Sequence, residues 1–158
     1  MTPIVVMGAS GAGKTTVARA LAARLGVPFA DADDLHPPAS VAAMRAGRPL
    51  TDTDRWPWLR DVAAVLAARD VVVACSSLKR AHRDVLREAG DVAFAHLDVA
   101  ADELRRRVAA RTGHFMPAAL VDGQLAALEP LGPGEHGITI AAATVDAAVD
   151  AIAAWARQ

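Results

Sequence analysis

Residues 8–15 read Gly8-Ala9-Ser10-Gly11-Ala12-Gly13-Lys14-Thr15, and the rest of the chain is organised around this stretch. The spacing is G-x-x-x-x-G-K-[ST], the pattern of a phosphate-binding loop. Its glycines permit positive φ angles and a close backbone approach, so successive N–H groups can surround phosphate oxygens. Lys14 adds positive charge for the β- and γ-phosphates, and Thr15 offers a hydroxyl to Mg²⁺.

The sequence on either side of this loop has the character that the motif requires. Residues 4–7 form a short apolar run typical of a buried strand. Residues 15–25 carry apolar side chains on one helical face, and Gly26 and Pro28 then end the helix. A strand, a glycine-rich loop and a helix N-terminus together predict a nucleotide phosphate site. The residues expected to bind the nucleotide are Gly8, Ala9, Ser10, Gly11, Ala12, Gly13, Lys14, Thr15, Thr16 and, from a later helix, Arg107.

Length and composition describe one globular domain over residues 1–158. Hydrophobic residues make up 53% of the chain and charged residues 22%, which excludes a disordered protein. The formal net charge of −1 argues against a nucleic-acid partner, and no apolar run has the length of a membrane span. Cys75 is the single cysteine, so no intramolecular disulfide or zinc cluster is expected. We expect a soluble cytoplasmic protein without a signal peptide or a membrane partner.

Strand and helix patterns alternate along the whole chain. Further strands are expected at residues 28–30, 71–75, 92–97 and 138–140. Further helices are expected at 38–46, 51–69, 76–89, 101–111, 118–128 and 144–155, with Thr51 and Asp54 at capping-box spacing and Ser76 or Ser77 as the cap of the fourth helix. Thr144 is expected to cap the last helix, which packs Val145, Val149, Ile152 and Trp155 in the core. This order predicts the α/β class, with a parallel sheet of about five strands between two helical layers. Ligands then bind at the carboxyl ends of the strands, where the polar clusters lie.

Asp31 and Asp33 follow the second strand, and they are the carboxylates best placed for chemistry. On an extended segment, residues two apart point the same way. One carboxylate can hold Mg²⁺ through water while the other accepts a proton from an alcohol. A turn or capping role is the alternative, and we expect it for Asp34. Asp98, after the fourth strand, is a second candidate metal ligand.

The arginines of residues 101–111 supply positive charge for a transferring phosphoryl group. Arg107 and Arg111 lie four apart on one helical face, so they can act together, whereas Arg105 and Arg106 are expected to face solvent. Arg111 precedes a loop at 112–117, where a lid over residues 111–130 is expected to hinge. Lys79 and Arg83 also lie four apart, and they either meet an anionic acceptor or face solvent.

Other prominent side chains have structural explanations. His36 precedes two prolines, and a lone histidine is usually a surface or capping residue. Trp56 and Trp58 are expected to pack in the core, as is Cys75 at the end of a central strand.

Several stretches together resemble the gluconate kinases of the P-loop type, relatives of shikimate kinases and nucleoside monophosphate kinases. The residues that carry the resemblance are 7–15, 31–37, Met44, 47–50, Asp52, Asp54, Arg55, 57–59, 75–79, Arg83, Asp84, Leu86, Arg87, 111–115, Gln124 and 128–130. The phosphate loop alone selects no family, whereas Leu35-His36-Pro37, Pro57-Trp58-Leu59 and Gly113-His114-Phe115 in this order are far more specific. The chain departs from the usual pattern of this family at Ala32, at His82 and after Pro130.

The resemblance implies ATP-dependent phosphorylation of D-gluconate at its 6-hydroxyl, with Mg²⁺, a closing lid and commonly a homodimer. It implies that Thr15 and Asp31 hold the metal, that Asp33 orients or deprotonates the hydroxyl, and that Lys14 and Arg111 act in catalysis. It adds six residues as contacts of the acceptor substrate: Asp33, His36, Lys79, Arg83, His114 and Gln124. Arg83 is expected to pair with the gluconate carboxylate.

Two alternatives stay open on the sequence. Another small-molecule kinase of the same fold would act on shikimate, another sugar acid or a nucleotide. A nucleotide-binding switch would transfer no phosphate, although residues 71–75 end without the aspartate expected of a switch GTPase.

Overall fold

The computed structural model describes residues 1–111, 118–141 and 143–158. Its strands are β1 (Ile4–Met7), β2 (Phe29–Asp31), β3 (Val72–Ala74), β4 (Ala93–Leu97) and β5 (Gly137–Ile140). Its α-helices are α1 (Lys14–Leu25), α2 (Pro38–Arg45), α3 (Asp52–Ala68), α4 (Arg80–Leu86), α5 (Ala101–Ala110), α6 (Ala118–Ala127) and α7 (Val145–Trp155). Two short 3₁₀ helices cover Ala32–Leu35 and Arg87–Ala89.

The five strands form one sheet in the order β2-β3-β1-β4-β5, and every neighbouring pair is parallel. The predicted α/β class and strand number are therefore confirmed. Strand β1 lies at the centre, and both of its faces are buried because alternate side chains enter two different cores. Ile4 and Val6 join one core, whereas Val5 and Met7 join the other.

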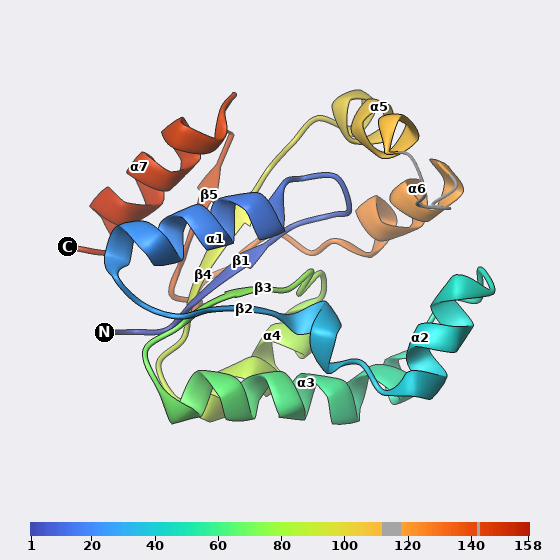
Figure 1. Cartoon of the computed structure of the whole chain (residues 1–158), viewed down its shortest axis with the longest axis horizontal. Helices are drawn as coiled ribbons and strands as arrows, with labels where there is room; N and C mark the ends of the chain where they lie inside the picture. The colour runs from blue at the N-terminus through green and yellow to red at the C-terminus, as the bar shows by residue number, and fades with distance from the viewer. Residues whose placement is uncertain (112–117, 142) are drawn as a thin grey trace.

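Helices cover both faces of the sheet (Figure 1). Helices α1 and α7 pack on one face, where Leu21 and Ile152 are fully buried. Helix α3 packs on the other face through Leu59 and Val62, beside α4. Helices α5 and α6 pack against each other beyond the carboxyl ends of the strands (Figure 1). No helix in the described ranges combines the length and the apolar character needed to cross a membrane.

Two local predictions about the helices are wrong. Helix α4 begins at Arg80 rather than at Ser76 or Ser77, because the Glu129 carboxylate accepts the Arg80 N–H at 2.7 Å and replaces a local cap. Val145, expected in the core, is 37% exposed at the first turn of α7. The remaining boundaries agree within a few residues, and Thr144 caps α7 as expected.

The capping box at the start of α3 is formed in full. The Thr51 hydroxyl accepts the Asp54 N–H at 3.1 Å, and the Asp54 carboxylate accepts the Thr51 N–H at 2.9 Å.

We predict that Thr51→Ala lowers the free energy of unfolding by about 1 kcal/mol, since a helix donor loses its acceptor. Urea denaturation of this variant beside Thr53→Ala, an exposed threonine in the same turn, provides the measurement. Equal losses in the two variants would contradict the assignment.

Candidate active site

The phosphate loop joins β1 to α1 in a conformation that needs glycine at two crowded positions. Gly8 has a φ of 148°, and a Cβ there would lie 3.0 Å from the carbonyl oxygen of Leu97. Gly11 has a φ of 86°, and a Cβ there would lie 3.1 Å from the Val108 side chain. The loop is thus pressed between the end of β4 and helix α5, and its glycines take the positive φ angles that the motif predicts.

Lys14 stands at the first position of α1, where its ammonium group donates to the Ala9 carbonyl within the loop at 3.1 Å. Burial lowers the pKa of Lys14, and the Asp33 carboxylate opposes this effect. The positive charge of Arg111 further lowers the pKa of Lys14, so Arg111 lies close enough to act on the charge of the loop. A cation held close to a loop of backbone donors suits a polyphosphate.

Thr15 and Asp31, the two expected metal ligands, are in direct contact. The Thr15 hydroxyl donates to Asp31 Oδ2 at 2.9 Å, across the gap between α1 and β2. Asp98, the second candidate metal ligand, is exposed just after the end of β4. The described residues contain no cluster of three or more histidine, cysteine or acidic side chains arranged to hold a metal. One hydroxyl and one carboxylate fit Mg²⁺, which keeps several waters and takes phosphate oxygens as further ligands.

The prediction that Asp31 and Asp33 lie on one extended segment and point the same way is wrong, because the extended segment ends at Asp31. Asp33 lies in the 3₁₀ helix that follows, and Asp31 Oδ1 accepts the Asp33 N–H at 3.0 Å as its cap. The turn nevertheless keeps the two carboxylates close, and Asp31 therefore bonds both Thr15 and the backbone that carries Asp33.

The Asp33 carboxyl is accessible from solvent. Its side chain is 85% exposed, yet surrounding protein desolvates it, and this desolvation together with the Asp31 charge raises its pKa. The Lys14 charge acts in the opposite direction. A carboxylate with a raised pKa, near a lysine of the phosphate loop, has the properties of a general base.

His36 is a buried side chain with an unused hydrogen-bonding atom. Its ring stacks on Trp58 at a centroid distance of 4.1 Å, and Trp58 Nε1 donates to the Ala32 carbonyl at 2.7 Å. His36 Nε2 lies 3.8 Å from Asp33 Oδ1, whereas Nδ1 is buried without a partner among the described residues. Burial lowers the pKa of His36, which favours the neutral ring. Nε2 is therefore the nitrogen of His36 that lies toward Asp33, whereas Nδ1 is closed off inside the protein.

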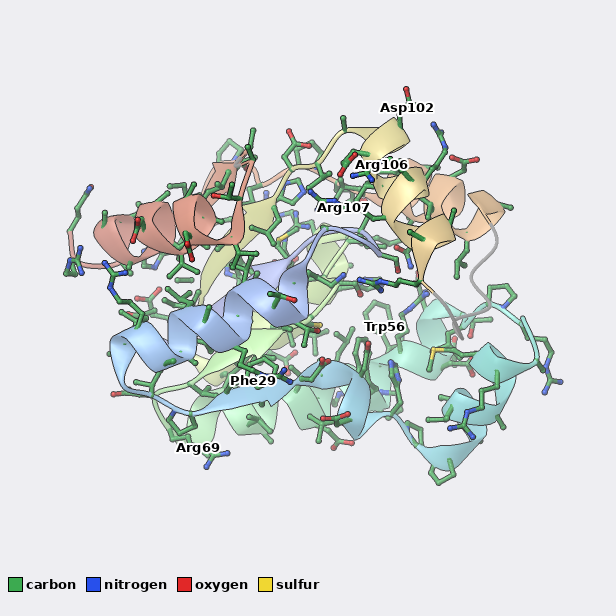
Figure 2. The ribbon with its side chains drawn as sticks, turned by 45° about the horizontal axis from the view of Figure 1, so that its top comes forward. Phe29, Trp56, Arg69, Asp102, Arg106 and Arg107 are labelled. Atoms are coloured by element: carbon green, nitrogen blue, oxygen red, sulfur yellow. The ribbon has the colours of Figure 1, made fainter. Side chains whose placement is uncertain are left out.

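Helix α5 brings one arginine onto the phosphate loop. Figure 2 shows Arg107 on the side of α5 toward the loop, with Asp102 farther from it. Arg107 donates to the Gly11 carbonyl at 3.2 Å and to Glu103 at 2.8 Å. Arg105 faces solvent as expected, with 41% of its side chain exposed, and it also forms a surface ion pair with Asp122 of α6 at 2.6 Å.

Gln124 also reaches the phosphate loop, from helix α6. Its carbonyl oxygen accepts the Ser10 N–H at 2.6 Å. Ser10 is one of the residues predicted to bind phosphate, so Gln124 occupies a donor that an anion would use. The structure therefore brings Gln124 to the nucleotide side of the site.

Lys79 lies at the carboxyl end of β3 and is held by Asp52 from the first turn of α3. The two charged groups are 3.0 Å apart, and the His82 ring approaches the same carboxylate at 3.1 Å. Hydrogen bonds from His82 and Lys79 lower the pKa of Asp52. Asp52 was not among the predicted site residues, since its sequence position indicates only a helix start.

The prediction that Arg83 contacts substrate is corrected by the structure. Its side chain is fully buried, and Arg83 Nε donates to Glu135 at 2.6 Å within an equally buried ion pair. Its other nitrogens donate to Glu135 and to the carbonyls of Ser77, Leu78 and Pro130. With these donors engaged inside the protein, Arg83 fastens the loop before β5 to the loop after β3. His114, the remaining predicted contact, lies outside the described residues.

A cavity of about 150 Å³ lies on the other flank of the phosphate loop. Gly13 and Val17 form one wall, and Ile140 and Thr144 form another. Arg107 also lines it, so the cavity adjoins the loop on the side opposite to Asp33. An apolar cavity with a few polar groups beside a phosphate loop suits the base of a nucleotide.

The sequence and the structure are both similar to those of known proteins. The AAA domain family matches residues 4–131. A gluconokinase from Gluconobacter oxydans is 49% identical over 145 residues, which cover 87% of this chain and 80% of that protein. The crystal structure of a gluconokinase from Sinorhizobium meliloti superposes with a TM-score of 0.90 at 44% identity, covering 99% of this chain and 92% of that one. A shikimate kinase from Acinetobacter baumannii, in complex with shikimate, shares the fold at a TM-score of 0.61 and 20% identity, covering 99% of this chain and 94% of that one.

We predict that Arg83→Met lowers the free energy of unfolding by about 3–5 kcal/mol, because it leaves Glu135 buried without its partner. Glu135→Gln should also destabilise the protein, and the double variant should lose less than the two single losses combined. A double-mutant cycle from urea denaturation measures this coupling. Additive losses would show that the pair contributes no interaction energy.

We predict that Gln124→Leu increases affinity for ADP about fivefold, since the phosphates no longer displace a hydrogen bond worth about 1 kcal/mol. Isothermal titration with ADP measures this affinity, with Ala126→Leu, at an exposed position of the same helix, as the control. A weaker affinity in Gln124→Leu would instead make Gln124 a ligand of the nucleotide.

Proposed function

The chain belongs to the gluconokinase family of kinases, and we propose that it transfers the γ-phosphoryl group of ATP to the 6-hydroxyl of D-gluconate. Its products would be 6-phospho-D-gluconate and ADP. The observation that carries the proposal is the arrangement of Asp33 beside Asp31 and Lys14, which sets a candidate base next to a phosphate loop. Identities of 49% and 44% to named gluconokinases support this acceptor.

ATP would lie across the phosphate loop, with its base in the cavity beside Arg107 and its γ-phosphate toward Asp33. The N–H groups of the loop and the Lys14 ammonium would hold the phosphates, and the Ser10 N–H would exchange Gln124 for a phosphate oxygen. Thr15 and Asp31 would hold Mg²⁺, which neutralises charge on the phosphates when bound. The cavity and the Thr15–Asp31 contact support this orientation.

In the reaction, Asp33 would orient the 6-hydroxyl and accept its proton. The hydroxyl oxygen attacks the γ-phosphorus as the bond from that phosphorus to the β–γ bridging oxygen breaks, and ADP carries away the electron pair. Lys14 and Arg111 would offset the charge that spreads over the phosphoryl oxygens. His36 Nε2, which lies 3.8 Å from Asp33 Oδ1, would hydrogen-bond a second hydroxyl of the acceptor and fix its orientation.

Residues 111–130 would form a lid that closes over ATP, with helix α6 as its described part. Arg105 of α5 pairs with Asp122 of α6 at 2.6 Å, so a movement of α6 away from α5 would have to break this surface ion pair. The proposal includes a homodimer, as the family resemblance implies. Light scattering on the purified protein measures the mass of the assembly in solution.

A coupled assay of ADP release from Mg-ATP tests the function. The acceptors are gluconate, other sugar acids, shikimate, AMP and water alone. Stimulation by gluconate above every other acceptor is the expected result. Stimulation by a different acceptor would overturn the substrate, and turnover that is equal with and without acceptors would overturn the kinase reaction.

We predict that Asp33→Asn lowers kcat by about 10²- to 10⁴-fold, the range of a lost general base, while gluconate still binds. Steady-state rates and gluconate titration measure the two quantities. A loss of less than tenfold would contradict the base role.

The same variant should be more stable than the wild-type protein at neutral pH. The raised pKa means that the folded state disfavours the ionised Asp33, so this carboxylate costs stability once it is charged. The gain in Asp33→Asn should therefore grow as the pH rises through the Asp33 pKa and vanish in acid. Urea denaturation across this pH range measures the gain, and a constant difference would exclude the assigned cause.

A further inference from the structure

A substrate that carries a carboxylate is usually bound through a cationic side chain of the protein. Arg83 was the expected cation, but its position in the structure does not allow it to bind the substrate. The Arg83 side chain is fully buried with Glu135 as its counter-ion. Lys79 is accessible, but its ammonium group already bonds Asp52 at 3.0 Å. The remaining cation at the first turns of α3 is Arg55.

Arg55 has hydrogen-bonding capacity that the described residues do not use. Its side chain is 31% exposed, and its nearest acidic atom, Asp52 Oδ1, is 3.7 Å away, beyond hydrogen-bond distance. No hydrogen bond from its guanidinium to another described residue is present. Asp52 is instead bonded by Lys79 and His82 at 3.0 and 3.1 Å. A half-buried guanidinium with five N–H donors to offer is a ready partner for a carboxylate.

The position of Arg55 is on the acceptor side of Asp33. Arg55 precedes Trp58 by three residues on α3, so the two side chains lie on one face of the helix, and Trp58 stacks on His36 at 4.1 Å. Burial has the larger effect in lowering the pKa of His36 and of His82, and the Arg55 charge acts in the same direction at both rings. His36 in turn adjoins Asp33. Trp56, the next residue of α3, meets the His82 ring edge-on at 5.7 Å and appears in Figure 2 at this end of α3.

The acidic groups beside Arg55 on α3 are hydrogen-bonded to other residues, so the positive charge of Arg55 can be matched by an anionic ligand. Asp33, Asp52 and Asp54 are acidic groups on this side. Asp52 already has Lys79 and His82 as partners, and Asp54 accepts the Thr51 N–H in the capping box. The surrounding histidines favour their neutral forms. Arg55 therefore retains positive charge that is not matched by a hydrogen-bonded carboxylate among the described residues.

We propose that Arg55 recognises the carboxylate of the acceptor substrate and thereby determines the preference for a sugar acid over a neutral sugar alcohol or amide. This inference rests on the proposed function, since it names the acidic group of that same substrate. The guanidinium would bind the carboxylate through two parallel N–H···O bonds while Asp33 holds the hydroxyl at the other end. A simple surface ion pair of Arg55 with Asp52, three residues earlier on α3, is the competing explanation.

The test compares Arg55→Ala, Arg55→Lys and Arg60→Ala, the last an exposed arginine on the same helix. Gluconate and gluconamide, which replaces the carboxylate by a neutral amide, serve as acceptors with Mg-ATP. In Arg55→Ala, KM for gluconate should rise about 10- to 100-fold, the loss of a charge-assisted hydrogen bond, with kcat and the ATP KM within about threefold of wild type. Arg55→Lys should recover part of the affinity, and Arg60→Ala should match wild type.

Gluconamide separates recognition of charge from general damage. The wild-type protein should use it poorly, and Arg55→Ala should not make it worse, so the preference for the acid collapses. An unchanged KM for gluconate in Arg55→Ala would overturn the inference, as would equal losses on gluconate and gluconamide. Gluconate titration by tryptophan fluorescence, without ATP, should show the same loss of affinity. Failure of the wild-type protein to use gluconate would overturn the proposed function itself, which distinguishes the two failures.

Discussion

The close packing of the phosphate loop against β4 and α5 is the constraint on which the rest of the structure depends. Gly8 and Gly11 lie where a side chain would meet the Leu97 carbonyl or the Val108 side chain. The Gly8 N–H also donates to the Ser76 carbonyl at 3.3 Å, which ties the loop to the end of β3. The loop is thereby fixed against three strands, and its N–H groups keep a conformation suited to phosphate.

Asp31 connects this loop to the acceptor side. One carboxylate oxygen accepts from Thr15 on α1, and the other accepts from the backbone of Asp33. A single side chain thus sets the distance between the nucleotide half of the site and the candidate base. Beyond Asp33, the stacking of His36 on Trp58 holds the 3₁₀ helix against α3. The first turns of α3 also carry Arg55 and Asp52, and Asp52 is the partner of Lys79. The site is therefore assembled from turns at the carboxyl ends of β1, β2 and β3.

Local signals in the sequence predict much of this architecture. The phosphate loop, the capping box of α3 and the buried strands follow from short-range rules that neighbouring residues satisfy by themselves. Arg83 shows where such rules fail. Its spacing from Lys79 suggested a shared exposed face, but its partner Glu135 lies 52 residues later in a loop without a distinctive pattern. A long-range ion pair leaves no periodic signal, and the same is true of the Gln124–Ser10 contact.

Asp31 and Asp33 illustrate an intermediate case. The sequence predicts two cooperating carboxylates, yet the extended geometry assumed for them is replaced by a capped 3₁₀ turn. The pairing survives because the Asp31 side chain bonds the backbone of Asp33 directly. Residue identity therefore predicted that Asp31 and Asp33 are associated, but it did not predict the backbone that joins them.

Identification of the phosphorylated atom tests the central claim most directly. Gluconate labelled with ¹³C at its sixth carbon would be incubated with Mg-ATP and the protein, and the product examined by ¹³C and ³¹P NMR. The account predicts a phosphomonoester whose phosphorus couples to the labelled carbon, formed in step with ADP. Inorganic phosphate as the only new phosphorus product, or an ester at another carbon, would contradict it.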